Sequence, residues 1–288
     1  MDGSMFDQAK RLVARAADYQ KELESSPLAS QLIDSSTPVV WLGNAAPGGW
    51  LTVATNPSPK EFIGRDQQLL SGRKARFYIR EQGVSMEEYK KDDRKLAETI
   101  RFYETYFLRD SAYRSWFGRP GGAKLEGFLN GMGGSFYSLD GYQSVIHSDL
   151  FPIATKTHMG RIKQKKELLG SAFSMAFFED KLKFLNPNLI ILLGREHCQL
   201  LERHGIQFSD PVRIERYPGA AWQTGFHSNL GIPVLGLHFK PSEQFLGLGG
   251  GMDRDHQSHG KYGTKQALNE IGSEVWENLS AVFPALHR

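Results

Sequence analysis

The chain has 288 residues, 40% of them hydrophobic and 23% charged, which are the proportions of a globular protein with a core of its own. Its single cysteine, Cys198, excludes an intramolecular disulfide and an iron–sulfur cluster held by four cysteines. Residues 1–26 are charged throughout and no later apolar run reaches membrane-spanning length, so we expect a cytoplasmic protein without a membrane partner. The formal net charge of +3 is compatible with a polyanionic partner but identifies none.

The first elements in chain order are a helix and two short strands. Residues 4–24 place apolar side chains at helical spacing with charges between them, which predicts an amphipathic helix. Short β-rich runs at 39–42 and 51–55 flank a stretch rich in glycine and proline, and the second run is expected to open the central sheet. The periodicity of residues 92–117 predicts one long helix.

The rest of the chain alternates between strand-like and helix-like patterns. Apolar runs predict strands at 144–150, 189–193 and 232–237, and helical patterns cover 167–184, 195–204 and 264–283. This alternation predicts a three-layer α/β/α fold with a central, mostly parallel four-stranded sheet. We interpret residues 1–288 as one domain, in which a helical extension, 1–35, precedes the catalytic core, 36–288.

Three turns that contain proline follow predicted strands. They are Asn56-Pro57-Ser58, Asp149-Leu150-Phe151-Pro152 and Lys240-Pro241-Ser242. The carboxyl ends of parallel strands meet at one edge of a sheet, so we expect the three turns to line one cleft. Proline fixes the backbone φ angle and so holds neighbouring polar groups in place, as pre-organised catalysis requires.

The order and spacing of these turns resemble the uracil-DNA glycosylase superfamily over residues 50–245. Lys240 stands where that family usually has His or Asn, and Asp149 where it usually has Asn. Asn56 to Phe62 and His147 to Pro152 are most similar to a bacterial branch that includes an anti-phage glycosylase acting on glucosylated hydroxymethylcytosine. The resemblance implies a monofunctional enzyme without a cofactor, which flips a base out of DNA, hydrolyses its N-glycosidic bond and leaves an abasic site.

Three residues are the candidates for chemistry. Asn56 is expected to position the attacking water, with Glu61 in reserve as a carboxylate base, unless Asn56 only closes an Asx-turn. An ionised carboxylate only accepts hydrogen bonds, so Asp149 should favour the donating edge of cytosine over uracil; the alternative is a turn cap. Lys240 could stabilise charge on the base or grip a phosphate, or be an ordinary solvated lysine.

Other residues are candidates for binding. His147 shares a strand face with Asp149, and it hydrogen-bonds the base or Asp149 or is a core histidine. Phe62 or Phe77 would stack on the flipped base. The expected DNA contacts, which surface solvation explains about as well for the basic residues, are Ser58, Arg73, Lys74, Arg76 and Ser242, with Leu246 and Leu248 as an apolar wedge.

The sequence leaves rival functions open. A uracil or mismatch glycosylase is the nearest alternative, and a non-catalytic nucleic-acid-binding module is favoured by the unusual Lys240. A metal-dependent, nucleotide-processing hydrolase would use a loop with Asp253, Asp255, His256 and His259, although a flexible loop without metal is the preferred interpretation. We expect DNA as the partner, no metal and a monomer.

Overall fold

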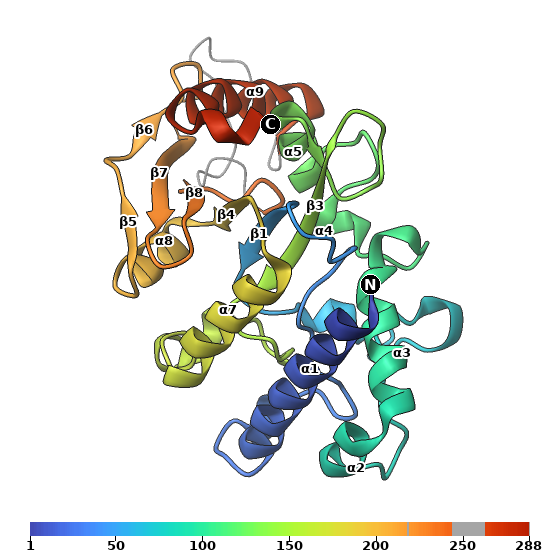
Figure 1. The fold of residues 1–288 in the computed structure, drawn as a ribbon. Coiled ribbons are helices and arrows are strands. Elements are labelled where there is room, and N and C mark those ends of the chain that lie inside the picture. Colours follow the sequence, from blue (N-terminus) through green and yellow to red (C-terminus); the bar gives the residue numbers. More distant parts are fainter. Residues whose placement is uncertain (218, 244–262, 288) are drawn as a thin grey trace. The chain divides into compact units, whose positions relative to one another are not determined.

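The structure, a computed structural model, describes residues 1–217, 219–243 and 263–287 (Figure 1). Backbone contacts divide the chain into two compact units. The first unit consists of Met1–Ala46, Thr55–Ala112 and His147–Asn186, and the second of Pro47–Ala54, Tyr113–Ile146 and Pro187–Arg288. The interpretation of the whole chain as one domain with an N-terminal extension stays a prediction.

The first unit is built mainly from helices. They are α1 (Gly3–Glu24), α2 (Met86–Lys91), α3 (Asp93–Glu104), α6 (Lys165–Leu169) and α7 (Ala172–Leu185). Helix α1, predicted from its amphipathic pattern, is confirmed and packs against α2, α3 and α7. The side chain of Asp2 caps it by accepting from the backbone N–H of Met5 at 2.9 Å, and its buried face includes Ala9, Val13 and Ala16.

The second unit contains a mixed sheet. Its strands are β1 (Trp50–Ala54), β2 (Gly134–Ser135), β3 (Gln143–Asp149), β4 (Leu189–Leu193), β5 (Ile206–Phe208), β6 (Val212–Arg213), β7 (Ala221–His227) and β8 (Ile232–Leu237). The order is β2-β3-β1-β4-β8-β7-β5, with β6 paired to β7, and the last three residues of β3 belong to the first unit. Strand β4 is buried along its whole length, which explains its uninterrupted apolar sequence.

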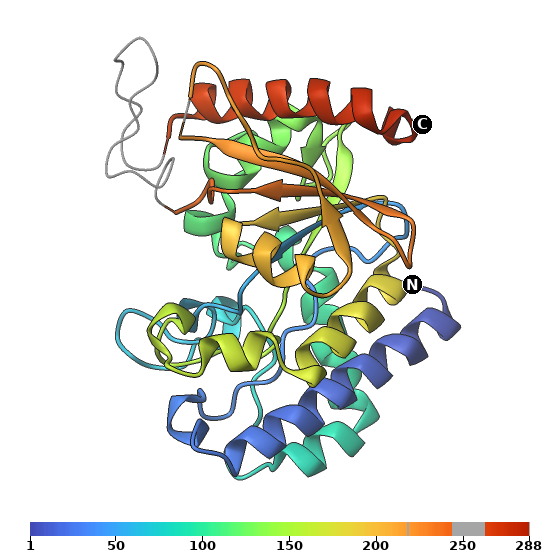
Figure 2. The same ribbon diagram turned by 90° about the vertical axis from the view of Figure 1, so that its left-hand side faces the viewer.

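Helices of the second unit cover both faces of this sheet. They are α4 (Arg114–Phe117), α5 (Lys124–Met132), α8 (Arg195–Glu202) and α9 (Lys265–Val282). Helix α9 packs along α5 and reaches β1 through a contact between the rings of Trp50 and Trp276, whose centroids are 4.8 Å apart. Helix α8 contacts β4, β5 and β8 on the opposite face (Figure 2). The prediction of an α/β fold is therefore confirmed.

The prediction of four mostly parallel strands is wrong in its finer detail. The four expected runs do form β1, β3, β4 and β8, and the pairs β1–β4 and β4–β8 are parallel. However, β7 adds to β8 in the antiparallel direction and pairs in turn with β5 and β6, so the described residues form a sheet of eight strands. Strands β5 and β6 have only three and two residues, too few to produce a recognisable alternation in sequence.

Two smaller expectations also fail. Residues 92–117 are not one helix: α3 ends before Thr105, whose hydroxyl donates to the backbone oxygen of Arg101 at 2.6 Å, and a 3₁₀ turn follows at Tyr106–Leu108. Residues 39–42 form no strand, because only Leu42 makes an isolated bridge, to His147. This segment instead bonds the chain that follows β3, and the N–H of Val39 donates to Pro152 at 2.7 Å.

Candidate active site

The turn after β1 and the loop after β3 are hydrogen-bonded to each other within the first unit. The backbone N–H of Phe151 donates to the backbone oxygen of Thr55 at 3.0 Å. The side-chain Nδ2 of Asn56 donates to the backbone oxygen of Ile153 at 3.3 Å and to Oγ1 of Thr155 at 3.2 Å. The turn of Asn56 and the loop after Asp149, two of the three turns identified from the sequence, therefore lie together. They follow β1 and β3, which are neighbouring strands of the sheet.

The orientation of the Asn56 amide differs from that of an Asx-turn. An Asx-turn needs the side-chain oxygen to accept from the backbone, whereas here Nδ2 donates, including to the oxygen of Pro57 at 3.2 Å. Within the described part of the chain, the side-chain oxygen of Asn56 accepts no hydrogen bond. An amide held through its nitrogen in this way can offer its oxygen to a water molecule.

Asp149, the last residue of β3, carries a buried carboxylate with an unsatisfied oxygen. Its side chain is 6% exposed, and Oδ1 is buried without a hydrogen-bond partner among the described residues. Nε2 of His147, on the same strand face, lies 3.6 Å from Oδ1. A buried acceptor without a donor costs free energy, so this oxygen is suited to a donor supplied by a ligand.

A buried lysine from α7 holds the end of β3. The ammonium of Lys181 donates to Oγ of Ser148 at 2.9 Å and to the backbone oxygen of Asp149. Burial lowers the pKa of Lys181 to about 7, although the negative charge of Asp149 acts in the opposite direction. Lys181 therefore fixes the backbone that carries Asp149 without occupying its free carboxylate oxygen.

A short 3₁₀ turn, Pro59–Glu61, carries a second buried carboxylate. The hydroxyl of Ser58 caps this turn by accepting from the backbone N–H of Lys60 at 3.3 Å, and Pro59 stands at its first position. The turn ends with the side chain of Glu61 buried. The segment from Asn56 to Glu61 thus carries both the Asn56 amide and the Glu61 carboxylate, only five residues apart.

The surroundings of Glu61 favour its protonated form. Burial raises the pKa of Glu61 to about 7, and the charge of Asp149 acts in the same direction. Two groups oppose the shift: Nη1 of Arg76, 3.6 Å away, and the hydroxyl of Tyr106, 2.8 Å from both carboxylate oxygens. A carboxylate that titrates near neutral pH can act as a general base under physiological conditions.

Phe62 and Phe77 are buried in the core of the first unit. Their rings stack with centroids 5.2 Å apart, and Phe77 stacks on Tyr106 at 5.4 Å. Both phenylalanines are at most 1% exposed. Their role in stacking on a flipped base stays a prediction, and in this structure they support the Glu61–Tyr106 pair.

The three basic residues of one expected DNA contact have different environments. Arg73 and Lys74 are exposed on a 3₁₀ turn, Gly72–Lys74. Arg76 is more buried, and it donates to the backbone oxygens of Ser111 and Lys60, both at 2.6 Å. Arg73 and Lys74 can therefore contact phosphates. The guanidinium of Arg76 instead holds the backbone at Lys60 and Ser111, next to Glu61.

The third turn belongs to the second unit. Nζ of Lys240 is 3.4 Å from Glu243 and 3.9 Å from Glu196, and its side chain is 27% exposed. Ser242 is buried and accepts from the backbone N–H of Leu125 at 2.8 Å, in the first turn of α5. Two other groups named from the sequence lie outside the described residues: Leu246 and Leu248, and Asp253, Asp255, His256 and His259.

Two residues of this arrangement were not identified from the sequence. Lys181 lies between Phe178 and Leu182, so a lysine on the apolar face of a predicted helix was the available signal. Tyr106 was hidden in an aromatic stripe that also contains Tyr103 and Phe107. Nothing in the stripe distinguishes the one hydroxyl that reaches Glu61.

No known family model matches the chain, and neither does any curated protein sequence. Among the residues that the structure describes, no helix is long and apolar enough to cross a membrane. The same residues contain no group of three or more His, Cys, Asp or Glu side chains that could hold a metal ion.

Proposed function

We propose that the chain is a monofunctional DNA glycosylase of the uracil-DNA glycosylase type, and that it excises a flipped modified cytosine. The proposed substrate is glucosylated hydroxymethylcytosine in phage DNA, and the proposed form is a cytoplasmic monomer. The observation that carries the proposal is the buried Oδ1 of Asp149, which accepts no hydrogen bond from the described residues. Asp149 ends the strand whose following loop is hydrogen-bonded to the turn of Asn56. The resemblance of both turns to the glycosylase motifs supports the same conclusion.

Base recognition in this proposal depends on the carboxylate of Asp149 as a hydrogen-bond acceptor. Cytosine offers its N4 amine, and a cytosine protonated at N3 offers a second donor beside it. Oδ1 accepts no hydrogen bond from any residue that the structure describes, so binding such a base would satisfy it. Uracil presents the O4 acceptor at the same place and would be repelled.

Hydrolysis requires a positioned water and a group that accepts its proton. The side-chain oxygen of Asn56 orients the water, and Glu61, whose pKa of about 7 leaves a large ionised fraction at neutral pH, accepts the proton. The water oxygen bonds to C1′ of the sugar while the C1′–N bond breaks, and the electron pair of that bond leaves with the base. A base already protonated at N3 departs neutral, which makes it the better leaving group.

Formation of abasic sites tests the proposal directly. Duplexes carrying uracil, cytosine, hydroxymethylcytosine or glucosylated hydroxymethylcytosine would be treated with protein and then with alkali, which cleaves at abasic sites. We expect cleavage at the glucosylated base, its loss in Asp149→Asn, and its retention in Asp140→Asn, which changes an exposed aspartate in the second unit. Absence of abasic sites in every duplex would favour the non-catalytic binding module, and cleavage at uracil alone would favour a uracil glycosylase.

A further inference from the structure

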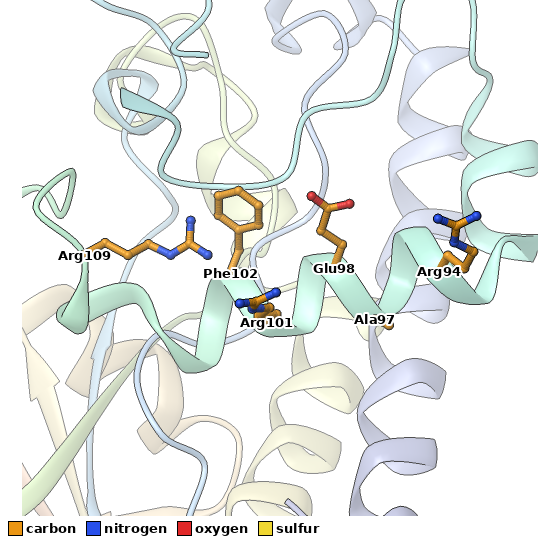
Figure 3. A pocket seen from close by; sticks show the side chains of 6 residues that line it. All are labelled: Arg94, Ala97, Glu98, Arg101, Phe102 and Arg109. Carbon is orange, nitrogen blue, oxygen red and sulfur yellow. The ribbon is translucent and has the colours of Figure 1, made fainter. Parts of the chain in front are cut away.

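A surface pocket of about 560 Å³ lies along α3, in the first unit, and shares no residue with the candidate active site. Six residues of α3 and the chain that follows it line the pocket, as Figure 3 shows: Arg94, Ala97, Glu98, Arg101, Phe102 and Arg109. Their spacing of three, four and seven residues brings the helical members to one face of α3. This face was not assigned a role from the sequence.

The pocket is strongly cationic for its size. Three guanidinium groups line it, and Glu98 is its one carboxylate. Arg94 and Arg101 are exposed, and their side chains make no ion pair or hydrogen bond with any residue in the described ranges. Unpaired arginines that line one pocket offer planar forks of donors, which match the oxygens of a phosphate group.

Arg109 and Phe102 form a flat platform at one end of the pocket. The guanidinium carbon of Arg109 is 3.9 Å from the centroid of the Phe102 ring, and Nε of Arg109 donates to Oγ1 of Thr105 at 2.9 Å. Burial lowers the pKa of Arg109, and so does the positive charge of Arg101. The mutual repulsion of these two cations would be relieved by an anion bound between them.

A phosphate site next to a flat aromatic platform suits a nucleotide. Aromatic rings and guanidinium planes both stack on nucleobases, and stacking does not depend on which base is present. Arg94 stands two helical turns before Arg101, roughly 10 Å along the axis, so that it can reach a second phosphate. We propose that this pocket binds a nucleoside phosphate, free or within single-stranded nucleic acid, with Arg94 and Arg101 on phosphate oxygens and Phe102–Arg109 against the base.

The test compares binding by two variants that lose the same charge. Arg94→Gln/Arg101→Gln removes two pocket arginines, whereas the control Arg11→Gln/Arg203→Gln removes two exposed arginines outside the pocket. Fluorescence anisotropy with a labelled single-stranded oligonucleotide should show at least tenfold weaker binding for the pocket variant and less than twofold for the control. Loss of two phosphate contacts should also flatten the salt dependence of the binding constant by roughly 1.4 in log–log slope.

A second readout locates the contact. Ultraviolet cross-linking to an oligonucleotide containing bromouracil should label the peptide that contains Phe102, and Phe102→Leu should abolish this label. Competition by a free nucleoside triphosphate at similar concentration would support a free nucleotide as the ligand, and its failure to compete would support a strand. Equal binding by both double variants, or cross-links only outside α3, would overturn the proposal. None of these measurements depends on base excision, so the proposed glycosylase function can fail without affecting them.

Discussion

At the scale of single residues, we expect Asp149 to distinguish a cytosine-derived substrate from uracil. Asp149→Asn replaces one accepting oxygen by a donating amide that faces a donor, and weak excision of uracil can appear in exchange. We expect a loss of roughly 2–4 kcal/mol in transition-state stabilisation on the modified cytosine. Single-turnover excision by wild type and variant on matched oligonucleotides measures it, and an unchanged rate on the modified cytosine would remove Asp149 from base recognition.

Asn56 should contribute to the reaction more than to binding. Its amide is fixed through Nδ2, and its oxygen is proposed to hold the attacking water, which is a transition-state role. We expect Asn56→Ala to abolish excision while DNA affinity changes by only a few-fold, with anisotropy measured beside the single-turnover rate. Near-normal turnover would contradict this role.

The raised pKa of Glu61 leads us to expect a pH-dependent excision rate. The pKa of Glu61 is raised to about 7, so the ionised carboxylate of Glu61 accumulates as the pH rises through 7. Because this carboxylate is the proposed general base, the excision rate should rise over the same range. Glu61→Gln should be slow and lose this limb of the profile, whereas Glu81→Gln, at an exposed glutamate, should keep it. A profile in Glu61→Gln that still rises through pH 7 would assign the limb to another group.

The same shift has a consequence for stability. Between the ordinary value of 4.5 and about 7, the folded protein keeps a proton on Glu61 that the unfolded chain has lost. The free energy of unfolding should therefore fall as the pH rises through this window, and Glu61→Gln should flatten the fall. Urea unfolding at several pH values gives this comparison independently of activity.

The candidate site residues at the ends of predicted strands could be identified from the sequence, but the residues that contact the site from other elements could not. Asn56 and Asp149 each follow an apolar run and adjoin a proline turn, which is a local pattern. The contact of Tyr106 with Glu61 spans 45 positions and that of Lys181 with Ser148 spans 33. Such contacts depend on tertiary packing, and the periodicity of the sequence does not indicate which distant residues meet.

At the scale of elements, α5 and α9 approach each other through glycine. A Cβ atom added at Gly272 of α9 would collide with the backbone oxygen of Phe128, and one at Gly131 of α5 with the backbone oxygen of Asn269. We expect Gly272→Ala to destabilise the protein by about 1–3 kcal/mol, because backbone cannot move aside as a flexible side chain does. Thermal unfolding beside Gly160→Ala, where an added Cβ meets no atom within 4 Å, provides the matched comparison.

The exposed turn of Arg73 and Lys74 should contact phosphates without reading sequence. Neutralising both with glutamine should weaken binding to all duplexes alike and flatten the salt slope by roughly 1.8. The Arg11→Gln/Arg203→Gln variant controls for the change in net charge, and equal slopes in the two variants would show that this turn is ordinary surface. Arg76 is left unchanged, since its donors bind backbone oxygens.

Element predictions succeeded where one periodic pattern filled the element. Helices α1 and α9 and strands β1, β3, β4 and β8 were each indicated by such a pattern. The pattern of residues 92–117 continued past the end of α3 because Tyr103 and Tyr106 are buried on both sides of Thr105. Burial in the core maintains the periodicity where the hydrogen-bonding of the helix stops.

At the scale of the whole molecule, the α/β class followed from alternating patterns, but the size of the sheet did not. The antiparallel part of the sheet, formed by β5, β6 and β7, consists mostly of short strands whose pairing is set by their neighbours. The net charge of +3 agrees with a polyanionic partner without selecting DNA.

Mass spectrometry of the bases released from intact DNA tests the central claim most directly. Wild-type protein would be incubated with DNA containing uracil, cytosine, hydroxymethylcytosine or its glucosylated form, and the free bases would be identified. We predict release of glucosylated hydroxymethylcytosine with abasic sites in equal number, and almost no release by Asp149→Asn. Release of uracil in preference to the modified cytosine, or of no base from any of these DNAs, would contradict the account.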